Sequence, residues 1–276
     1  KHAVGYAGLK DRFAVTTQWY SVYLPGRHDV DWERLGIEGV DLLQCTRHRR
    51  KLQRGALKSN RFTIMLRAVG YGSGSSIERI LERCEAIRQR GVPNYYGEQR
   101  FGHDMRNLVD AERMFSQPRK RLPRHKRSLC LSAARSWLFN NILSERVAAG
   151  NWNRRVEGDV FMLDGRSACF QDDASEDLDQ RLQNAEIHPS AVLWGEGETM
   201  AAGDCYAIES AVIERHPLFK QGLIDARLEQ QRRPLRLLVR DIECRPKAAD
   251  LVLTFSLAAG SYATVVLREL IGLEKN

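Results

Sequence analysis

The chain has 276 residues, of which 43% are hydrophobic and 28% are charged. These fractions are typical of globular proteins, and the length allows one large core or two ordinary ones. No apolar run approaches the roughly 18 residues that a membrane-spanning helix needs, so we do not expect a membrane protein. The formal net charge of +8 favours a polyanionic partner.

Six cysteines are scattered along the chain without a Cys-x-x-Cys pair or a Cys/His cluster of zinc spacing. This pattern predicts free thiols in a reducing compartment, so we expect a cytoplasmic protein. The sequence begins at Lys1 without a signal peptide and enters a strand-like stretch almost at once. We therefore expect that an upstream segment is missing from it.

Positive charge is concentrated in two blocks that contain no acidic residue, at 47–58 and 119–127. Either block alone is typical of a solvated loop. Two of them favour contact with a phosphate backbone, since each lysine or arginine that neutralises a phosphate releases a counterion. The residues proposed for this contact are Arg47, Arg49, Arg50, Lys51, Arg54, Lys58, Arg119, Lys120, Arg121, Arg124, Lys126 and Arg127.

Regular elements are predicted first near the N-terminus. Residues 14–24 are rich in β-branched and aromatic types and predict a strand that Pro25 and Gly26 end. Residues 61–69 alternate between apolar and other types, which predicts a second, half-buried strand. Ser75 and Glu78 form a capping box for a helix that Gly91 stops.

Further elements are predicted in the second half of the chain. A wide apolar stripe predicts a helix over 132–148. The stretch 151–234 is harder to interpret, although 160–163 is strand-like. Residues 251–257 predict a strand, which Gly260 breaks before a helix capped by Ser261. This order favours an α+β fold whose first and last segments share a sheet, with an insertion entered at 119–127 and left near 233–239.

Two short segments carry residues suited to chemistry. Asp11 lies between Lys10 and Arg12 at a turn, and nearby positive charge keeps a carboxylate ionised, as a nucleophile or base requires. From these residues alone, an ordinary turn aspartate is the better interpretation of Asp11. Residues 94–102 combine tyrosines, an amide and an arginine that could bind a nucleobase or form a buried aromatic corner. No metal-binding spacing or Gly-rich phosphate loop is present, so no metal or cofactor is expected.

Four segments, in order, resemble the TruD family of tRNA pseudouridine synthases. They are GYAGLKDRFAVTTQW (5–19), NYYGEQRFG (94–102), LSAARSWLFN (131–140) and AGSYATVVLREL (259–270). The resemblance spans nearly the whole chain. Tyr96 replaces the family's usual phenylalanine but keeps an aromatic face.

The resemblance implies a mainly antiparallel pseudouridine synthase domain formed by 1–119 and 238–276, with an inserted α/β TRUD domain at 120–237. It also implies that Asp11 is catalytic and that Asn94 and Tyr96 line the uridine pocket. Lys10 and Arg268 are our candidates for the cation beside Asp11.

The expected reaction is isomerisation of uridine 13 in tRNA to pseudouridine. It is carried out by a monomer that needs neither a cofactor nor a protein partner. Two alternatives remain open at this point. One is a catalytically impaired RNA-binding module of the same fold, and the other is a Mg²⁺-dependent nuclease that uses Asp11 with further carboxylates.

Overall fold

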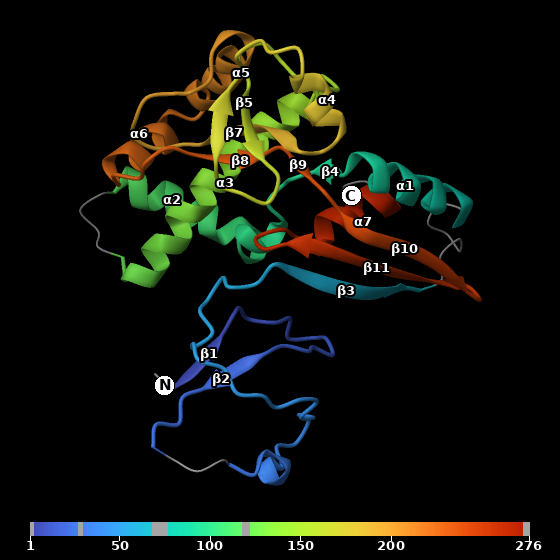
Figure 1. Ribbon diagram of the computed structural model, residues 1–276. Helices are drawn as coiled ribbons and strands as arrows, with labels where there is room; N and C mark the ends of the chain where they lie inside the picture. Colours follow the sequence, from blue (N-terminus) through green and yellow to red (C-terminus); the bar gives the residue numbers. More distant parts are fainter. Residues whose placement is uncertain (1–2, 27–29, 68–76, 118–121, 273–276) are drawn as a thin grey trace. The chain divides into compact units, whose positions relative to one another are not determined.

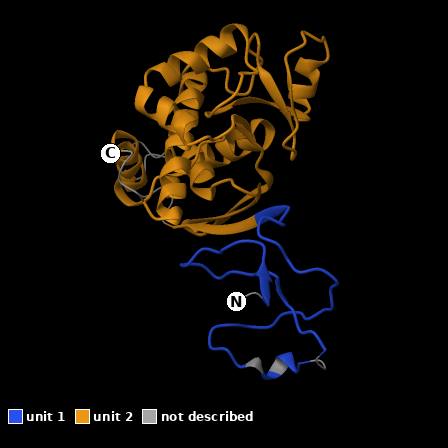
Figure 2. Cartoon of the chain, turned by 90° about the vertical axis from the view of Figure 1, so that its left-hand side faces the viewer, with its two compact units in different colours: residues 1–60 blue, residues 61–276 orange. Residues whose placement is uncertain are grey.

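The computed structural model describes residues 3–26, 30–67, 77–117 and 122–272. The chain forms two compact units, residues 1–60 (unit 1) and residues 61–276 (unit 2), shown in different colours in Figure 2. Each unit has its own secondary structure.

Unit 1 contains little regular structure. Strands β1 (Val4–Tyr6) and β2 (Tyr20–Val22) form an antiparallel pair, and a 3₁₀ helix covers Trp32–Leu35. The strand predicted over 14–24 is therefore limited to its last part. The reason is that a strand needs a partner and a buried face, whereas Val15 is fully exposed.

Unit 2 begins within strand β3 (Ser59–Leu66) and contains seven α-helices among its described residues. The helices are α1 (Ile77–Arg90), α2 (Arg106–Ser116), α3 (Arg124–Ala148), α4 (Leu178–Gln183), α5 (Gly203–Glu214), α6 (Pro217–Asp225) and α7 (Ala263–Ile271). The remaining strands are β4 (Val92–Pro93), β5 (Val160–Leu163), β6 (Cys169–Gln171), β7 (Ile187–Leu193), β8 (Gln231–Pro234), β9 (Arg236–Leu237), β10 (Arg240–Lys247) and β11 (Asp250–Ala258). Short 3₁₀ helices cover Glu98–Arg100 and His103–Met105.

One core of unit 2 lies between the β10–β11–β3 sheet and helices α1 and α7 (Figure 1). Phe62 and Phe255 stack there with ring centroids 5.4 Å apart. Leu253, Phe255 and Leu257 alternate along β11, and all three are buried. The predicted half-buried strand near 61–69 and the predicted terminal strand are thus neighbours in one sheet, which confirms that distant parts of the chain share it.

The second core is built on α3. This helix packs against α2, α5, α6 and strand β7 of the four-stranded β6–β5–β7–β8 sheet. Leu138, Phe139 and Leu143 of α3 are completely buried in this core. The predicted stripe is confirmed, but the helix starts at Arg124, so part of the second basic block forms its first turn rather than a linker.

The two cores meet at the segment that follows α1. Gly91 has φ of +72°, and a Cβ there would lie 2.4 Å from the carbonyl oxygen of Leu237, so a larger side chain would push the two segments apart. Strand β4 then pairs with β9, with Val92 opposite Leu237 and Pro93 opposite Arg236. Tyr95 packs against both cores.

Other predictions have mixed outcomes. Ser75, predicted as a cap, lies outside the described residues. Helix α7 follows Tyr262, which makes no side-chain capping hydrogen bond, so the predicted Ser261 cap is wrong by one position. The six cysteines are free thiols, as predicted. The helices of the described ranges include none long and apolar enough to cross a membrane.

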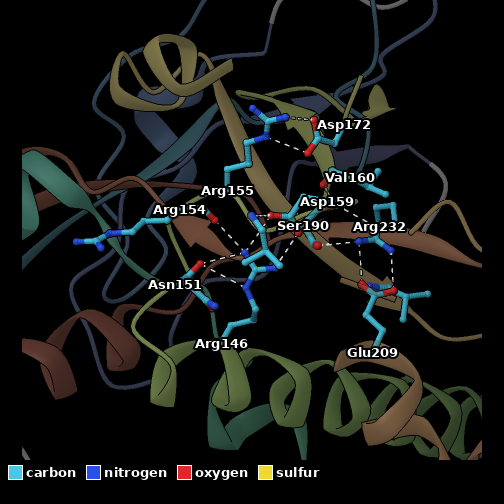
Figure 3. A network of polar contacts seen from close by, with 12 residues as sticks. Arg146, Asn151, Arg154, Arg155, Asp159, Val160, Asp172, Ser190, Glu209 and Arg232 are labelled. Atoms are coloured by element: carbon cyan, nitrogen blue, oxygen red, sulfur yellow. Dashed lines mark hydrogen bonds and ion pairs between the residues drawn. The ribbon is translucent and has the colours of Figure 1, made fainter. Parts of the chain in front are cut away.

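A set of buried and partly buried ion pairs links the α3-centred core to the four-stranded sheet (Figure 3). We call it the Asp159 network, and it consists of Arg146, Arg155, Asp159, Asp172, Ser190, Glu209 and Arg232. Asp159 is completely buried and binds Arg146 through both carboxylate oxygens, at 2.7 and 3.0 Å. Arg155 binds Asp172, and Arg232 binds Glu209. Every guanidinium of the network thus meets a carboxylate.

Candidate active site

Asp11 lies in an irregular, exposed loop of unit 1. The ammonium of Lys10 donates to Oδ1 of Asn60 at 2.8 Å, and the guanidinium of Arg12 lies 5.4 Å from the ring centroid of Phe13. The ring of Phe13 is 94% exposed. The loop therefore presents its carboxylate to solvent, among cations that interact with other residues of unit 1.

In unit 2, the backbone pairing after α1 fixes the position of Asn94 and Tyr96. The register of β4 and β9 continues through a hydrogen bond from the Asn94 N–H to the Leu235 carbonyl, at 2.8 Å. In an antiparallel pair, one step forward along one segment matches one step back along the other. This register brings Tyr96 opposite Arg233.

The loop that carries Tyr96 is also fixed by α3. The side-chain oxygen of Asn140 accepts from the Tyr96 N–H at 2.9 Å, and its amide nitrogen donates to the Tyr96 carbonyl at 3.0 Å. One residue later, a Cβ on Gly97 would lie 2.7 Å from Oε1 of Gln99 and 3.0 Å from Cδ1 of Tyr262. The loop therefore fits tightly against the start of α7.

Around this loop, five residues form what we call the Tyr96 cluster: Asn94, Tyr96, Arg100, Arg233 and Tyr262. The guanidinium carbon of Arg233 lies 4.0 Å from the Tyr96 ring centroid, and that of Arg100 lies 5.0 Å from it. Nε of Arg100 donates to the Tyr262 hydroxyl at 2.9 Å. Two cations thus lie against one aromatic side chain.

The two positive charges of the Tyr96 cluster are stabilised without a carboxylate. Within the described ranges, neither Arg100 nor Arg233 takes part in an ion pair. Burial lowers the pKa of Arg233, the hydroxyls of Tyr96 and Tyr262 oppose this shift, and Arg100 adds to it. Arginine stays charged in proteins, so aromatic faces and carbonyl oxygens must stabilise the charge.

The predicted pocket residues differ in their surroundings. Asn94 is only 3% exposed; its amide nitrogen donates to the Pro234 carbonyl at 2.8 Å, and its side-chain oxygen accepts from Arg233 at 2.6 Å. Tyr96 is partly exposed. The guanidinium of Arg268 lies 4.8 Å from the ring centroid of Tyr95, and its charged partner is Glu269 at 3.8 Å. That Lys10 or Arg268 pairs with Asp11 stays a prediction.

The predicted backbone-binding residues are exposed where the structure describes them. All six of the first block are exposed, and Arg54 donates to the Tyr6 hydroxyl at 2.6 Å. Arg124, Lys126 and Arg127 lie in the exposed first turn of α3, where Lys126 also pairs with Asp110 at 3.0 Å. Arg119, Lys120 and Arg121 lie outside the described residues.

Sequence reasoning did not single out Asn140, Arg233 or Tyr262 as site residues. Asn140 and Tyr262 lie within family-like segments, and that was their only signal. Arg233 lies in an otherwise ordinary Arg-Arg-Pro run, and its hydrogen bond to Asn94 crosses 139 positions of sequence. Only the fold brings these residues together.

Comparisons with known proteins agree on one family. The family model "tRNA pseudouridine synthase D (TruD)" matches residues 1–108 and 103–270. A tRNA pseudouridine synthase D of Methylococcus capsulatus is 52% identical over 97% of this chain and 75% of its own length. The one of Hydrogenovibrio crunogenus is 45% identical over 97% and 76%.

Structural similarity leads to the same fold. A crystal structure of a putative tRNA pseudouridine synthase D from Methanosarcina mazei superposes with a TM-score of 0.76. It covers 99% of this chain and 82% of its own, at 23% identity. The α+β fold is thereby confirmed. The chain belongs to the tRNA pseudouridine synthase D family.

Proposed function

We propose that this protein isomerises a uridine of tRNA to pseudouridine. The observation that carries the proposal is that three of the four family-like segments meet around Tyr96. Asn94 and Arg100 belong to the segment 94–102, Asn140 belongs to 131–140, and Tyr262 belongs to 259–270. Residues far apart in sequence thus build one polar, aromatic and cationic site, as expected for a nucleotide-binding pocket.

Asp11 is our candidate for the catalytic group. The reaction breaks the bond between N1 and C1′, forms a bond between C5 and C1′, and moves the proton from C5 to solvent while N1 gains one. Asp11 would act at the sugar, either by attacking C1′ or by removing the C2′ proton. A cation, Lys10 or Arg268, would keep the carboxylate ionised.

Asn94 and Tyr96 are our candidates for binding the base. A uridine within a helical stack must be flipped out before its glycosidic bond is accessible, at a cost of a few kcal/mol. Stacking on an aromatic ring is worth about 1–3 kcal/mol per base, so Tyr96 can offset much of this cost. Asn94 would set the orientation of the base.

The partner that we propose is tRNA, modified at uridine 13 and bound by a monomer through the two basic blocks. The inserted domain at 120–237 would contribute to the choice of tRNA. The two cores support a separate inserted region, because one draws its residues from 101–235 and the other chiefly from 80–92 and 237–270. Helix α2, before residue 120, packs with the inserted region. A cytoplasmic location fits the six free thiols.

The test compares pseudouridine formation on tRNA transcripts by the unaltered protein and by Asp11→Asn. We expect no detectable product from the variant at unchanged tRNA affinity. Asp31→Asn is a matched control, since Asp31 is an exposed aspartate of unit 1 that pairs with Arg34 at 2.9 Å, and it should keep full activity. Equal rates for Asp11→Asn and the unaltered protein would contradict the catalytic assignment. If the unaltered protein and Asp11→Asn both bind tRNA but form no pseudouridine, the result would favour an RNA-binding module.

A further inference from the structure

Two consecutive arginines of β8 reach in opposite directions, as neighbouring residues of a strand do. Arg232 points into the Asp159 network, where it binds Glu209 at 2.8 Å and the carbonyl of Ser190 at 2.7 Å (Figure 3). Arg233 instead binds Asn94 and lies on the ring of Tyr96. One strand is therefore anchored in the α3-centred core and also contacts the proposed uridine site.

All three nitrogens of the Arg233 guanidinium donate to atoms of the protein. Nη2 donates to Oδ1 of Asn94 at 2.6 Å, and Nε donates to the Asn94 carbonyl at 3.3 Å. Nη1 and Nη2 also lie within 3.5 Å of the Gly260 carbonyl, just before Tyr262. Because each nitrogen faces an acceptor of the protein, the geometry favours a role of Arg233 within the protein over direct binding of an RNA phosphate.

The same guanidinium controls the two proposed base-binding side chains. It holds the oxygen end of the Asn94 amide while the Pro234 carbonyl holds the nitrogen end, which fixes the orientation of a buried amide. Its position 4.0 Å from the Tyr96 ring centroid restrains that ring as well. A planar fork that binds an amide and stacks on an aromatic face is a combination that lysine cannot reproduce.

We propose that Arg233 is a positioning residue for the isomerisation. It sets the geometry of Asn94 and Tyr96. Through strand β8 it also links the position of these two side chains to the position of the inserted region. This inference rests on the proposed function. It predicts a defect in the chemical step rather than in tRNA affinity, because Arg233 acts on Asn94 and Tyr96 of the protein.

The experiment uses Arg233→Gln and Arg233→Lys, with Arg215→Gln as the control. Arg215 is an exposed arginine that binds Glu145, and it belongs to neither the Asp159 network nor the Tyr96 cluster. For each protein, the tRNA dissociation constant is measured at several salt concentrations, with the single-turnover rate at saturating tRNA and the melting temperature.

We expect Arg233→Gln to lower the single-turnover rate by at least about tenfold, since small misplacements of positioning groups cost up to about 10²-fold. Arg233→Lys keeps a cation near Tyr96 but loses the planar guanidinium that binds Asn94. Its rate should therefore lie between that of Arg233→Gln and that of the unaltered protein. Affinity and its salt dependence should stay unchanged, and Arg215→Gln should match the unaltered protein. If Arg233→Gln does not fold, the single-turnover rate and tRNA affinity of Arg233→Lys test the inference instead.

A double variant separates positioning from a general structural role. If Arg233 acts through Asn94, Arg233→Gln combined with Asn94→Ala should be no slower than the slower single variant. Multiplying rate losses would overturn the inference. So would a salt slope reduced by about one in Arg233→Gln, because such a change indicates that Arg233 neutralises a phosphate. Normal rates in both Arg233 variants overturn this inference alone, whereas an inactive unaltered protein overturns the proposed function and the inference with it.

Discussion

The Asp159 network and the Tyr96 cluster both contain buried or partly buried arginines, but they stabilise these cations differently. In the network each guanidinium meets a carboxylate, and the Arg146–Asp159 pair is 2% and 0% exposed. In the Tyr96 cluster two guanidinium groups lie on aromatic rings and bind hydroxyl, amide and carbonyl groups. The first arrangement is neutral and serves the fold. The second keeps a net positive charge, which suits a site for RNA.

The largest expected effect is on stability and concerns the network. Asp159→Ala leaves Arg146 buried without its carboxylate and removes the acceptor of the Val156 N–H. Breaking a buried pair in this way should lower the free energy of unfolding by about 3–5 kcal/mol, measured by urea denaturation. As a control, Glu243→Gln breaks the exposed pair with Arg245 and should cost less than about 1 kcal/mol. Similar values for both variants would show that the network does not stabilise the fold.

The next effect concerns Tyr96 itself. Tyr96→Leu should lower kcat/KM by about 10- to 100-fold, because a stacked base is worth about 1–3 kcal/mol. Tyr96→Phe keeps the aromatic face and matches the residue that the family usually carries, so it should stay within a few-fold of the unaltered enzyme. Tyr96→Phe should melt close to the unaltered protein, whereas Tyr96→Leu removes the ring on which Arg233 lies and should melt at a lower temperature, so binding and rate are compared below both melting temperatures. A larger loss for phenylalanine than for leucine would argue against stacking.

A smaller effect is expected for the basic block at 47–58, which contains no carboxylate. Changing Arg49, Arg50 and Lys51 to glutamate should weaken tRNA binding by at least about tenfold and reduce the salt slope by roughly 0.9 for each phosphate that is no longer neutralised. The melting temperature should not change, since the three side chains are exposed. An unchanged slope would show that this block is a solvated loop.

The smallest effect is a pH dependence of stability that arises at His188 in strand β7. His188 is 3% exposed; Arg236 donates to its Nδ1 at 2.9 Å, and its Nε2 lies 3.0 Å from Asp164. Burial lowers the pKa of His188, the hydrogen bond to Asp164 opposes this shift, and Arg236 adds to it. Below pH of about 6.5 the unfolded chain takes up a proton that folded His188 resists. The free energy of unfolding should therefore fall as the pH drops through this value.

Urea denaturation at pH 7.5 and 5.5 measures this dependence. His188→Asn, which keeps an acceptor for Arg236, should show a smaller difference between the two pH values. Part of the slope will remain, because burial also lowers the pKa of His216. An equal difference in variant and unaltered protein would show that His188 does not contribute.

Elements with a regular apolar pattern could be predicted from the sequence. Helices α1, α3 and α7 and strand β11 were predictable because each has one buried face and a clear period. Helix α2 was missed, since only Leu108 and Ala111 are fully buried and two left-handed residues, Asp104 and Met105, precede it. Local patterns are informative where a single face meets the core.

The site was predictable only in part. Asp11, Asn94 and Tyr96 are candidates that motifs suggest, whereas Arg233 and Asn140 contact this region through hydrogen bonds across 139 and 44 positions of sequence. Their residue types carry no local signal, because an arginine in a strand and an asparagine in a helix are ordinary there. The partners that give such residues a role are known only once the chain is folded.

The last experiment maps pseudouridine on total tRNA that lacks it at position 13, after incubation with the purified protein. We expect new pseudouridine at uridine 13, and none when Asp11→Asn replaces the unaltered protein. Modification at another position would contradict the proposed substrate. Modification that survives Asp11→Asn would contradict the role of Asp11.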